Sequence, residues 1–264
     1  SYSWNKTLNT TTTTQGKIKV EDIANPGVVL GISDGTFEVK GRLDLIQPNG
    51  PSDILTYKGS NYNVQWDVHG GIPKVDLWYS TNNGSDGWNN PVVSNITAGD
   101  ESYSWPVPDS IGYNLSVKVV DHDDSTVYDT SNNTFPIKGA ITLFAPTGGT
   151  EEWLVYSNQT IQWNTTGTYP GKINIYFSDN GGGSWAYLTE VNAGADGSLV
   201  NYSWDPVWNN ITTGAKISVN TTVGSSLVDV SAASTNFTIK GKVTVARPYS
   251  PEVLYANEPY HKKS

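Results

Sequence analysis

The sequence predicts an all-β protein made of tandem two-sheet sandwiches, and three observations lead to that prediction. Short segments alternate apolar and polar residues with a period of two, as half-buried strands do. Clusters of Gly, Asn and Ser, which favour turns, separate these segments. The same short signatures recur about every 100 residues, and no segment sustains the 3.6-residue period of a helix.

Three signatures define the repeat. The first is Tyr-Ser-Trp, whose tryptophans lie 101 and 99 residues apart, at Trp4, Trp105 and Trp204. The second, Phe-x-(Ile/Val)-Lys-Gly, closes each copy at 37–41, 135–139 and 237–241. The third ends in proline and opens the next copy, at 45–48, 143–146 and 245–248.

These signatures predict the domain boundaries. Two whole domains are expected, at 42–139 and 140–240. Residues 1–41 are then the C-terminal half of a domain, and residues 241–264 are the N-terminal part of a further one. Each closing Lys-Gly leads at once into the next opening strand, so linkers are almost absent. Short linkers favour a stiff rod over a flexible string.

Each whole domain is expected to have its own core. Apolar residues share one face of every predicted strand, and they recur at equivalent places in the two domains: Val64/Trp66, Val75/Leu77/Tyr79 and Leu115/Val117/Val119, then Ile161/Trp163, Ile173/Ile175/Phe177 and Ile217/Val219. We expect the core to centre on Trp66, Trp163 and the Tyr-Ser-Trp aromatics, because each such ring buries about 150–250 Å².

Composition excludes several classes of function. Cysteine is absent, which excludes disulfides, zinc–thiolate sites and a catalytic thiol. The net charge of −9 argues against nucleic acid and anionic lipid as partners, since both require clustered Lys and Arg. Charged residues are 16% of the chain, below the usual ~25%. Such a polar but weakly charged surface is typical of extracellular β-proteins.

One set of motifs resembles known families. Pro-Thr-Gly-Gly-Thr-Glu-Glu-Trp at 146–153 precedes Ile-Gln-Trp at 161–163 and a Gly-rich hairpin ending in Trp at 176–185; the other whole domain has the same order, with changes, at 48–50, 64–66 and 79–88. This order resembles immunoglobulin-like or fibronectin-III-like domains of microbial surface proteins, and is more closely similar to Ser/Thr-rich, Kre9/Knh1-type cell-wall domains of yeast. The resemblance covers both whole domains. It implies immunoglobulin-like sandwiches with an exported, structural or cell-wall-associated role.

N-glycosylation acceptors are the strongest chemical signal. The motif Asn-x-Ser/Thr occurs twelve times among the 25 asparagines, whereas random placement predicts about five. Several of these asparagines alternate with inward residues, which places them on the solvent face that a glycan requires. The acceptors are Asn5, Asn9, Asn83, Asn95, Asn114, Asn132, Asn158, Asn164, Asn201, Asn210, Asn220 and Asn236. The run 10–14, all Thr, is either a site of O-linked sugar or a loop.

An acidic cluster has two interpretations. Asp121, Asp123, Asp124 and the downstream Asp129 supply the oxygen ligands that calcium prefers at domain ends. The alternative is a solvated loop. The loop is favoured, because the next domain has Asn220-Thr221-Thr222 at this place and no acids. No other cofactor is expected.

Exposed aromatic residues could bind a glycan. Trp78 is the best probe, because its neighbours Leu77 and Tyr79 occupy the opposite face of the strand. Four other tryptophans fall outside the predicted inward phase or in loops: Trp88, Trp153, Trp185 and Trp208. The hairpin at 178–185 also resembles the Asp-box of sialidase-type propellers, where the motif is a structural turn, and a structural turn is expected here.

Catalysis is not expected. None of His69, His122 and His261 lies in a recognised catalytic motif. Glu151 and Glu152 are the nearest to a carboxylate pair, but neighbours in a strand point to opposite faces.

The favoured function is a structural repeat module of an extracellular filament, sheath, S-layer or adhesin stalk, and the alternative is a carbohydrate-binding module. Its partners would be further repeats or neighbouring copies, and possible glycans. Two accounts of the half-domains remain open. Either the chain belongs to a longer array, or residues 241–264 of one subunit complete residues 1–41 of the next by strand addition. The joined halves lack the counterpart of about 163–200, which favours the array.

Overall fold

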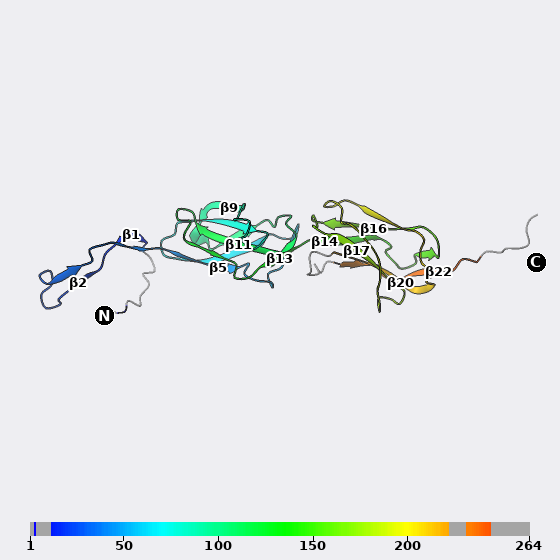
Figure 1. Cartoon of the computed structure of the whole chain (residues 1–264), viewed down its shortest axis with the longest axis horizontal. Coiled ribbons are helices and arrows are strands. Elements are labelled where there is room, and N and C mark those ends of the chain that lie inside the picture. The colour runs from blue at the N-terminus through cyan, green and yellow to red at the C-terminus, as the bar shows by residue number, and fades with distance from the viewer. Residues whose placement is uncertain (1–2, 4–11, 222–230, 244–264) are drawn as a thin grey trace, which may run out of the picture.

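The computed structural model describes residue 3, residues 12–221 and residues 231–243. Acceptors Asn5 and Asn9, and the segment 244–264, lie outside these residues. Figure 1 shows a small N-terminal hairpin followed by two β-sandwiches that lie one after the other along the long axis of the molecule.

The first sandwich contains nine strands and one short helix. One sheet has the order β10-β7-β5 and the other the order β6-β13-β11-β8-β9, with β12 paired to β11. The bounds are β5 (Arg42–Gln47), β6 (Leu55–Thr56), β7 (Tyr62–His69), β8 (Lys74–Ser80), β9 (Asn90–Thr97), the 3-10 helix η1 (Ala98–Asp100), β10 (Ser102–Trp105), β11 (Gly112–Asp121), β12 (Tyr128–Thr130) and β13 (Phe135–Lys138).

The second sandwich repeats this arrangement strand for strand. Its sheets have the orders β14-β16-β19 and β15-β22-β20-β17-β18, with β21 paired to β20. The bounds are β14 (Ala140–Ala145), β15 (Glu152–Leu154), β16 (Gln159–Thr166), β17 (Lys172–Ser178), β18 (Ala186–Asn192), β19 (Val200–Trp204), β20 (Thr212–Thr221), β21 (Ser231–Ala233) and β22 (Phe237–Lys240). In both sandwiches one pairing is parallel, β6 with β13 and β15 with β22, and the rest are antiparallel.

Two packed sheets with this strand order form an immunoglobulin-like sandwich, as the sequence predicts. No sheet of the described residues takes strands from both sandwiches. In the described part of the chain, η1 is the one helical element. No helix there is long and apolar enough to cross a bilayer.

The predicted inward residues are buried. Trp66 and Trp163 are at most 1% exposed, and Trp105 and Trp204 at most 3%. Tyr103 is partly buried and packs against this core. The period-two pattern therefore identified the core face of the strands for which inward residues were predicted.

The expectation that Trp153 is exposed is wrong. Trp153 is 3% exposed, because β15 pairs parallel to β22 and turns this ring inward. The ring contacts Phe237 at 4.6 Å and Trp204 at 6.0 Å between centroids. The strand has only three residues, which is too short for a periodic pattern to show in the sequence.

The N-terminal hairpin consists of two short ladders. β1 (Thr13–Gly16) pairs with β4 (Phe37–Val39), and β2 (Lys19–Glu21) pairs with β3 (Leu30–Ile32). In the described residues these strands join neither sandwich, but the hairpin meets the first sandwich at Gly41 and Lys40.

Candidate functional site: acceptor asparagines and domain junctions

Ten of the twelve predicted acceptors lie in the described residues, and none of these ten is buried. Seven are exposed: Asn83, Asn95, Asn114, Asn132, Asn158, Asn201 and Asn236. Three are half-buried: Asn164, Asn210 and Asn220. All ten thus have solvent access.

The acceptor side chains differ in what holds them. The Asn158 amide donates to Asp205 at 3.3 Å and accepts from Ser203 at 2.9 Å. The Asn210 amide donates to Asp179 at 3.1 Å. The contacts with Asp205 and Asp179 engage the amide nitrogen that would carry the sugar at Asn158 and Asn210.

The junction between the two sandwiches is held by a carboxylate from the second. One oxygen of Asp196 accepts the Gly167 N–H at 2.9 Å, within its own domain. The other lies 2.5 Å from the Lys58 ammonium and 3.3 Å from the Tyr57 hydroxyl, both in the first domain. These partners, first the Gly167 N–H and then Lys58, lower the pKa of Asp196, and the same contact raises the pKa of Lys58.

A second carboxylate reaches across in the opposite direction. Asp109, in the first sandwich, accepts both the backbone N–H and the hydroxyl of Thr168 at 2.8 Å. Between the two carboxylates, Ile111 packs on Gly167, where an added Cβ would lie 2.8 Å from the Ile111 Cδ1. Hydrogen bonds from carboxylates of both domains and the apolar contact of Ile111 with Gly167 fix how the two domains meet.

The connection itself leaves no room for a side chain. A Cβ on Gly139, the residue between the domains, would lie 2.0 Å from the Thr166 carbonyl oxygen and 2.6 Å from the Tyr169 hydroxyl. The glycine that closes each repeat is therefore required here by close packing of the next domain.

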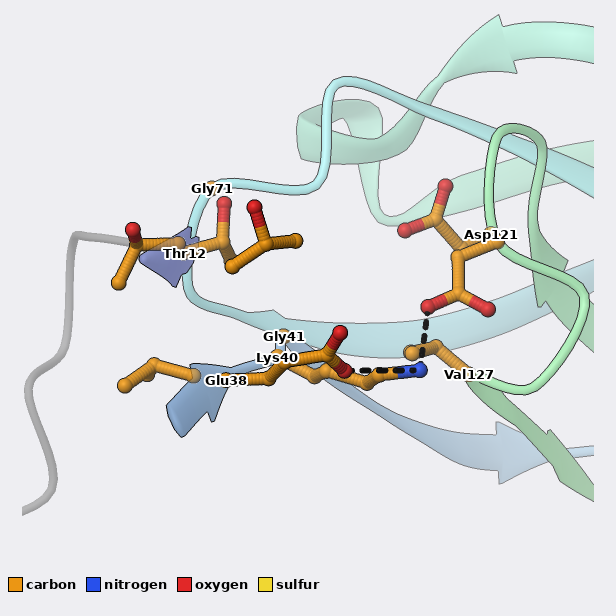
Figure 2. A pocket seen from close by; sticks show the side chains of 11 residues that line it. Thr12, Glu38, Lys40, Gly41, Gly71, Asp121 and Val127 are labelled. Atoms are coloured by element: carbon orange, nitrogen blue, oxygen red, sulfur yellow. Dashed lines mark ion pairs between the residues drawn. The ribbon is translucent and has the colours of Figure 1, made fainter. Parts of the chain in front are cut away.

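The hairpin meets the first sandwich differently. The Lys40 ammonium lies 3.8 Å from Glu38 (Figure 2). It also lies 2.8 Å from Asp124 and 2.7 Å from the Thr126 hydroxyl. Lys40, with Thr126, lowers the pKa of Asp124 to about 2. Lys40 and Asp124 line an open hollow of about 350 Å³ between the hairpin and the sandwich (Figure 2).

The structure does not bring the four acidic residues of the candidate calcium site together. Asp124 binds Lys40, Asp121 accepts the Asp123 N–H at 3.0 Å, and Asp129 accepts the Leu45 N–H at 2.7 Å. The described residues contain no group of three or more His, Cys, Asp or Glu placed to hold a metal ion.

Trp78 lies on the outer face of β8, as predicted, and is half-buried between the neighbouring strands at Lys118 and Pro91. More open rings occur in the second domain, where Trp185 is 41% and Trp208 is 37% exposed. These two rings line a hollow of about 210 Å³ together with Asp179, Ser184 and Asn210.

The Gly-rich hairpins are held as structural turns. The Asn180 side-chain oxygen accepts the Ser184 N–H at 2.9 Å, and the Ser178 hydroxyl accepts the Gly182 N–H at 2.9 Å. The first domain repeats both contacts, with Asn82 accepting from Asp86 and Ser80 from Gly84. The polar side chains of the motif close the turn.

The carboxylates considered for catalysis are bound within the fold. Glu151 accepts the Trp153 indole N–H at 3.0 Å and the Thr147 N–H at 3.1 Å, while Glu152 forms an ion pair with Lys240 at 2.6 Å. His69 and His122 each contact a single aspartate.

Sequence reasoning missed the junction residues Lys58, Asp109 and Asp196. None of the three belongs to a repeat signature. Lys58, for example, is replaced by Tyr156 at the equivalent position of the second domain, where the residue also follows the parallel strand and also has positive φ (56° and 60°). The sequence did contain one indication of the junction, the glycine of the Lys-Gly signature, because Gly139 lies where the two domains are in contact.

Comparison with known proteins found similar solved structures. No protein-family model and no curated relative matches the chain. Similar solved structures include titin domains I67–I69 in an E-to-A variant (TM-score 0.35, 11% identity, covering 86% of this chain and 74% of that one) and the ICAM-5 D1–D4 ectodomain fragment (TM-score 0.35, 14% identity, 83% and 60%). A titin Ig tandem, A164–A165, is also similar (TM-score 0.30, 10% identity, 77% and 100%). At these scores the assignment of an immunoglobulin-like fold rests on the sheet topology above.

Proposed function

We propose that this chain is a structural repeat module of an extracellular, N-glycosylated surface assembly, such as a filament, sheath, S-layer or adhesin stalk. The observation that carries the proposal is the junction between the sandwiches. Asp196 of the second domain binds Lys58 of the first, and Asp109 of the first binds Thr168 of the second. Ile111 packs on Gly167 between the domains, and Gly139 connects them without a linker. A junction of this kind supports a stiff rod that transmits force or sets a spacing.

Two further features support this role over catalysis. Acceptors with solvent access lie on both sandwiches, which suits a protein outside the cell. In addition, the acidic side chains weighed for chemistry hold turns, strands or junctions together.

The test is the intact mass of the protein from its native source, with peptide mapping. We expect sugar-sized increments above 28.6 kDa, placed first on the exposed acceptors Asn83, Asn95, Asn114, Asn132 and Asn236. A bare mass on native material would contradict the glycoprotein role.

Carbohydrate binding is a second candidate, and the hollow between Trp185 and Trp208 favours it. Binding sites are concave, lined by aromatic faces and completed by a few polar groups, which here are Asp179, Ser184 and Asn210. The Trp208 ring packs edge-on against Phe177 and Trp204, with 5.9 Å and 5.7 Å between ring centroids.

A polysaccharide that binds there should quench tryptophan fluorescence. Trp185→Ala should abolish the response and Trp78→Ala should preserve it. The reverse pattern would move the site to the outer face of β8, and no response across a broad glycan panel would exclude this candidate.

A further inference from the structure

The aromatic hollow of the second sandwich contains one of the glycosylation acceptors. Trp185 and Trp208 line it together with Asn210, the acceptor of the motif Asn-Ile-Thr at 210–212. Trp185 is 41% and Trp208 is 37% exposed, so both rings offer apolar surface to the solvent. An attachment point for sugar and two open indole rings therefore line the same hollow.

A tight turn places the acceptor next to a ring. The Asn210 N–H donates to the Trp208 carbonyl oxygen at 2.8 Å, across a single intervening residue. Side chains hold the turn as well, because the Asn210 amide donates to the Asp179 carboxylate at 3.1 Å. The Thr212 hydroxyl donates to the Asp179 carbonyl oxygen at 2.7 Å. A sugar on Asn210 would therefore begin close to the Trp208 ring.

The first sandwich has the same turn without the ring or the acceptor. There the Ser110 N–H donates to the Pro108 carbonyl oxygen at 2.9 Å, so Pro108 and Ser110 occupy the places of Trp208 and Asn210. The ring and the acceptor are present together in one domain and replaced together in the other. This joint replacement indicates that the two residues serve one purpose.

A docked neighbouring domain leaves this turn accessible. The second sandwich binds this end of the first through Asp109 and Ile111. Even so, Pro108 and Ser110 are only half-buried. Access to the equivalent turn at Asn210 is therefore compatible with a domain packed on the same end.

The lining of the hollow suits a sugar. One face of a pyranose ring consists of slightly positive C–H groups, which pack on the negative face of an indole. Asp179 and Ser184 supply polar groups for the sugar hydroxyls. The volume of about 210 Å³ is below the roughly 300–1,000 Å³ of sites for drug-sized ligands, which favours the first units of a glycan over a long polysaccharide.

We propose that this hollow is the seat of the protein's own N-linked glycan on Asn210, whose first sugar units stack on Trp208 and Trp185. Attachment keeps the sugar at an effective concentration on the order of millimolar, which fills a site even of weak affinity. An outside polysaccharide would have to displace it, so the second candidate function requires Asn210 to be bare. The inference deepens the proposed glycoprotein role and rests on it.

The attachment is compatible with the contacts of Asn210. A glycosyltransferase of the host joins the Asn210 Nδ2 to the anomeric carbon of a glycosyl phosphate donor. The bond from that carbon to the phosphate oxygen breaks, the phosphate leaves with the electron pair, and the amide loses one of its two protons. The remaining N–H can still donate to Asp179.

Residue-resolved oxidation tests the seat. The native glycoprotein and its Asn210→Gln variant, made in the same host, are exposed to hydroxyl radicals and mapped by mass spectrometry. We expect Asn210 to carry sugar, and Trp185 and Trp208 to be oxidised several-fold more slowly in the native protein than in the variant. The matched control is Asn201→Gln, which removes an exposed acceptor on β19 of the same domain and should leave both rates unchanged.

Two comparisons separate loss of the sugar from loss of the fold. Trp163 is 0% exposed, so an unchanged oxidation rate at Trp163 shows that Asn210→Gln is folded. The unaltered chain made in a host without N-glycosylation removes the sugar without any substitution. It should match Asn210→Gln at both Trp185 and Trp208.

The outcomes also separate this inference from the proposed function. A bare Asn210 beside glycosylated acceptors elsewhere overturns the seat and leaves the glycoprotein role intact, whereas bare acceptors throughout contradict both. Sugar on Asn210 without protection of Trp185 and Trp208 overturns the seat. Protection that appears only when a polysaccharide is added also overturns it, because the hollow would then belong to an outside ligand.

Discussion

The C-terminal ends of the two sandwiches have equivalent residues in opposite environments. Ile111 and Ile211 each precede the strand that pairs with the closing strand. Ile111 is 8% exposed because the next domain packs on it, whereas Ile211 is 68% exposed in the described structure. The backbone has positive φ at both Lys58 and Tyr156, yet among the described residues only Lys58 binds a partner across a junction. The two domains thus share the backbone of the sandwich and of its end loops, while the side chains that face a junction differ between them.

The largest effects should come from the feature that the two domains share. Trp66→Ala and Trp163→Ala each remove a ring that is at most 1% exposed, and each should lower the free energy of unfolding by about 3–5 kcal/mol. Urea denaturation followed by circular dichroism measures this. Similar losses for the two variants are expected, and a loss in only one would show that the cores are not equivalent.

At the C-terminal ends of the sandwiches, equivalent substitutions should have different effects on stability. Ile111→Ala should cost about 2–5 kcal/mol, because it empties a buried contact with Gly167. Ile211→Ala should change stability by less than about 0.5 kcal/mol, since the side chain is exposed. Thermal unfolding of the two variants, measured side by side, compares them directly. Equal effects would mean that Ile111 contributes nothing through the junction.

Glycine at the junction offers a matched pair. Gly167 (φ +95°) and Gly197 (φ +72°) both adopt positive φ, so alanine at either site costs about 1–3 kcal/mol of backbone strain. Only Gly167→Ala also places a Cβ 2.8 Å from Ile111, while a Cβ at Gly197 meets nothing within 4 Å. Small-angle scattering should show a changed domain arrangement for Gly167→Ala alone. A change in both variants would assign the effect to strain.

The fold was largely readable in the sequence because a repeat presents every pattern more than once. Burial at Val117 and Ile217 follows from the same alternation in two copies, and the glycines of the Lys-Gly signature follow from the spacing. The junction residues were not readable, since Asp109 and Asp196 act between domains and neither belongs to a signature. Trp153 was misplaced because its strand is too short to show a period.

The smallest expected effect is the loosening of the junction between the sandwiches at low pH. Because the Gly167 N–H and Lys58 lower the pKa of Asp196 from its ordinary 3.8, this carboxylate stabilises the docked junction fully above that range. The contribution falls as the pH drops through the lowered pKa, where Asp196 becomes protonated and Lys58 loses its partner. Scattering between pH 7 and pH 3 should therefore show a junction that loosens with acid, and Asp196→Asn should appear loosened already at neutral pH. Lys172→Ala removes an ion pair with Glu190 inside one domain and is the control, since it should leave the arrangement of the domains unchanged. If that control loosened the junction as much as Asp196→Asn, general loss of charge would explain the effect, and the carboxylate would have no special part in holding the two sandwiches together.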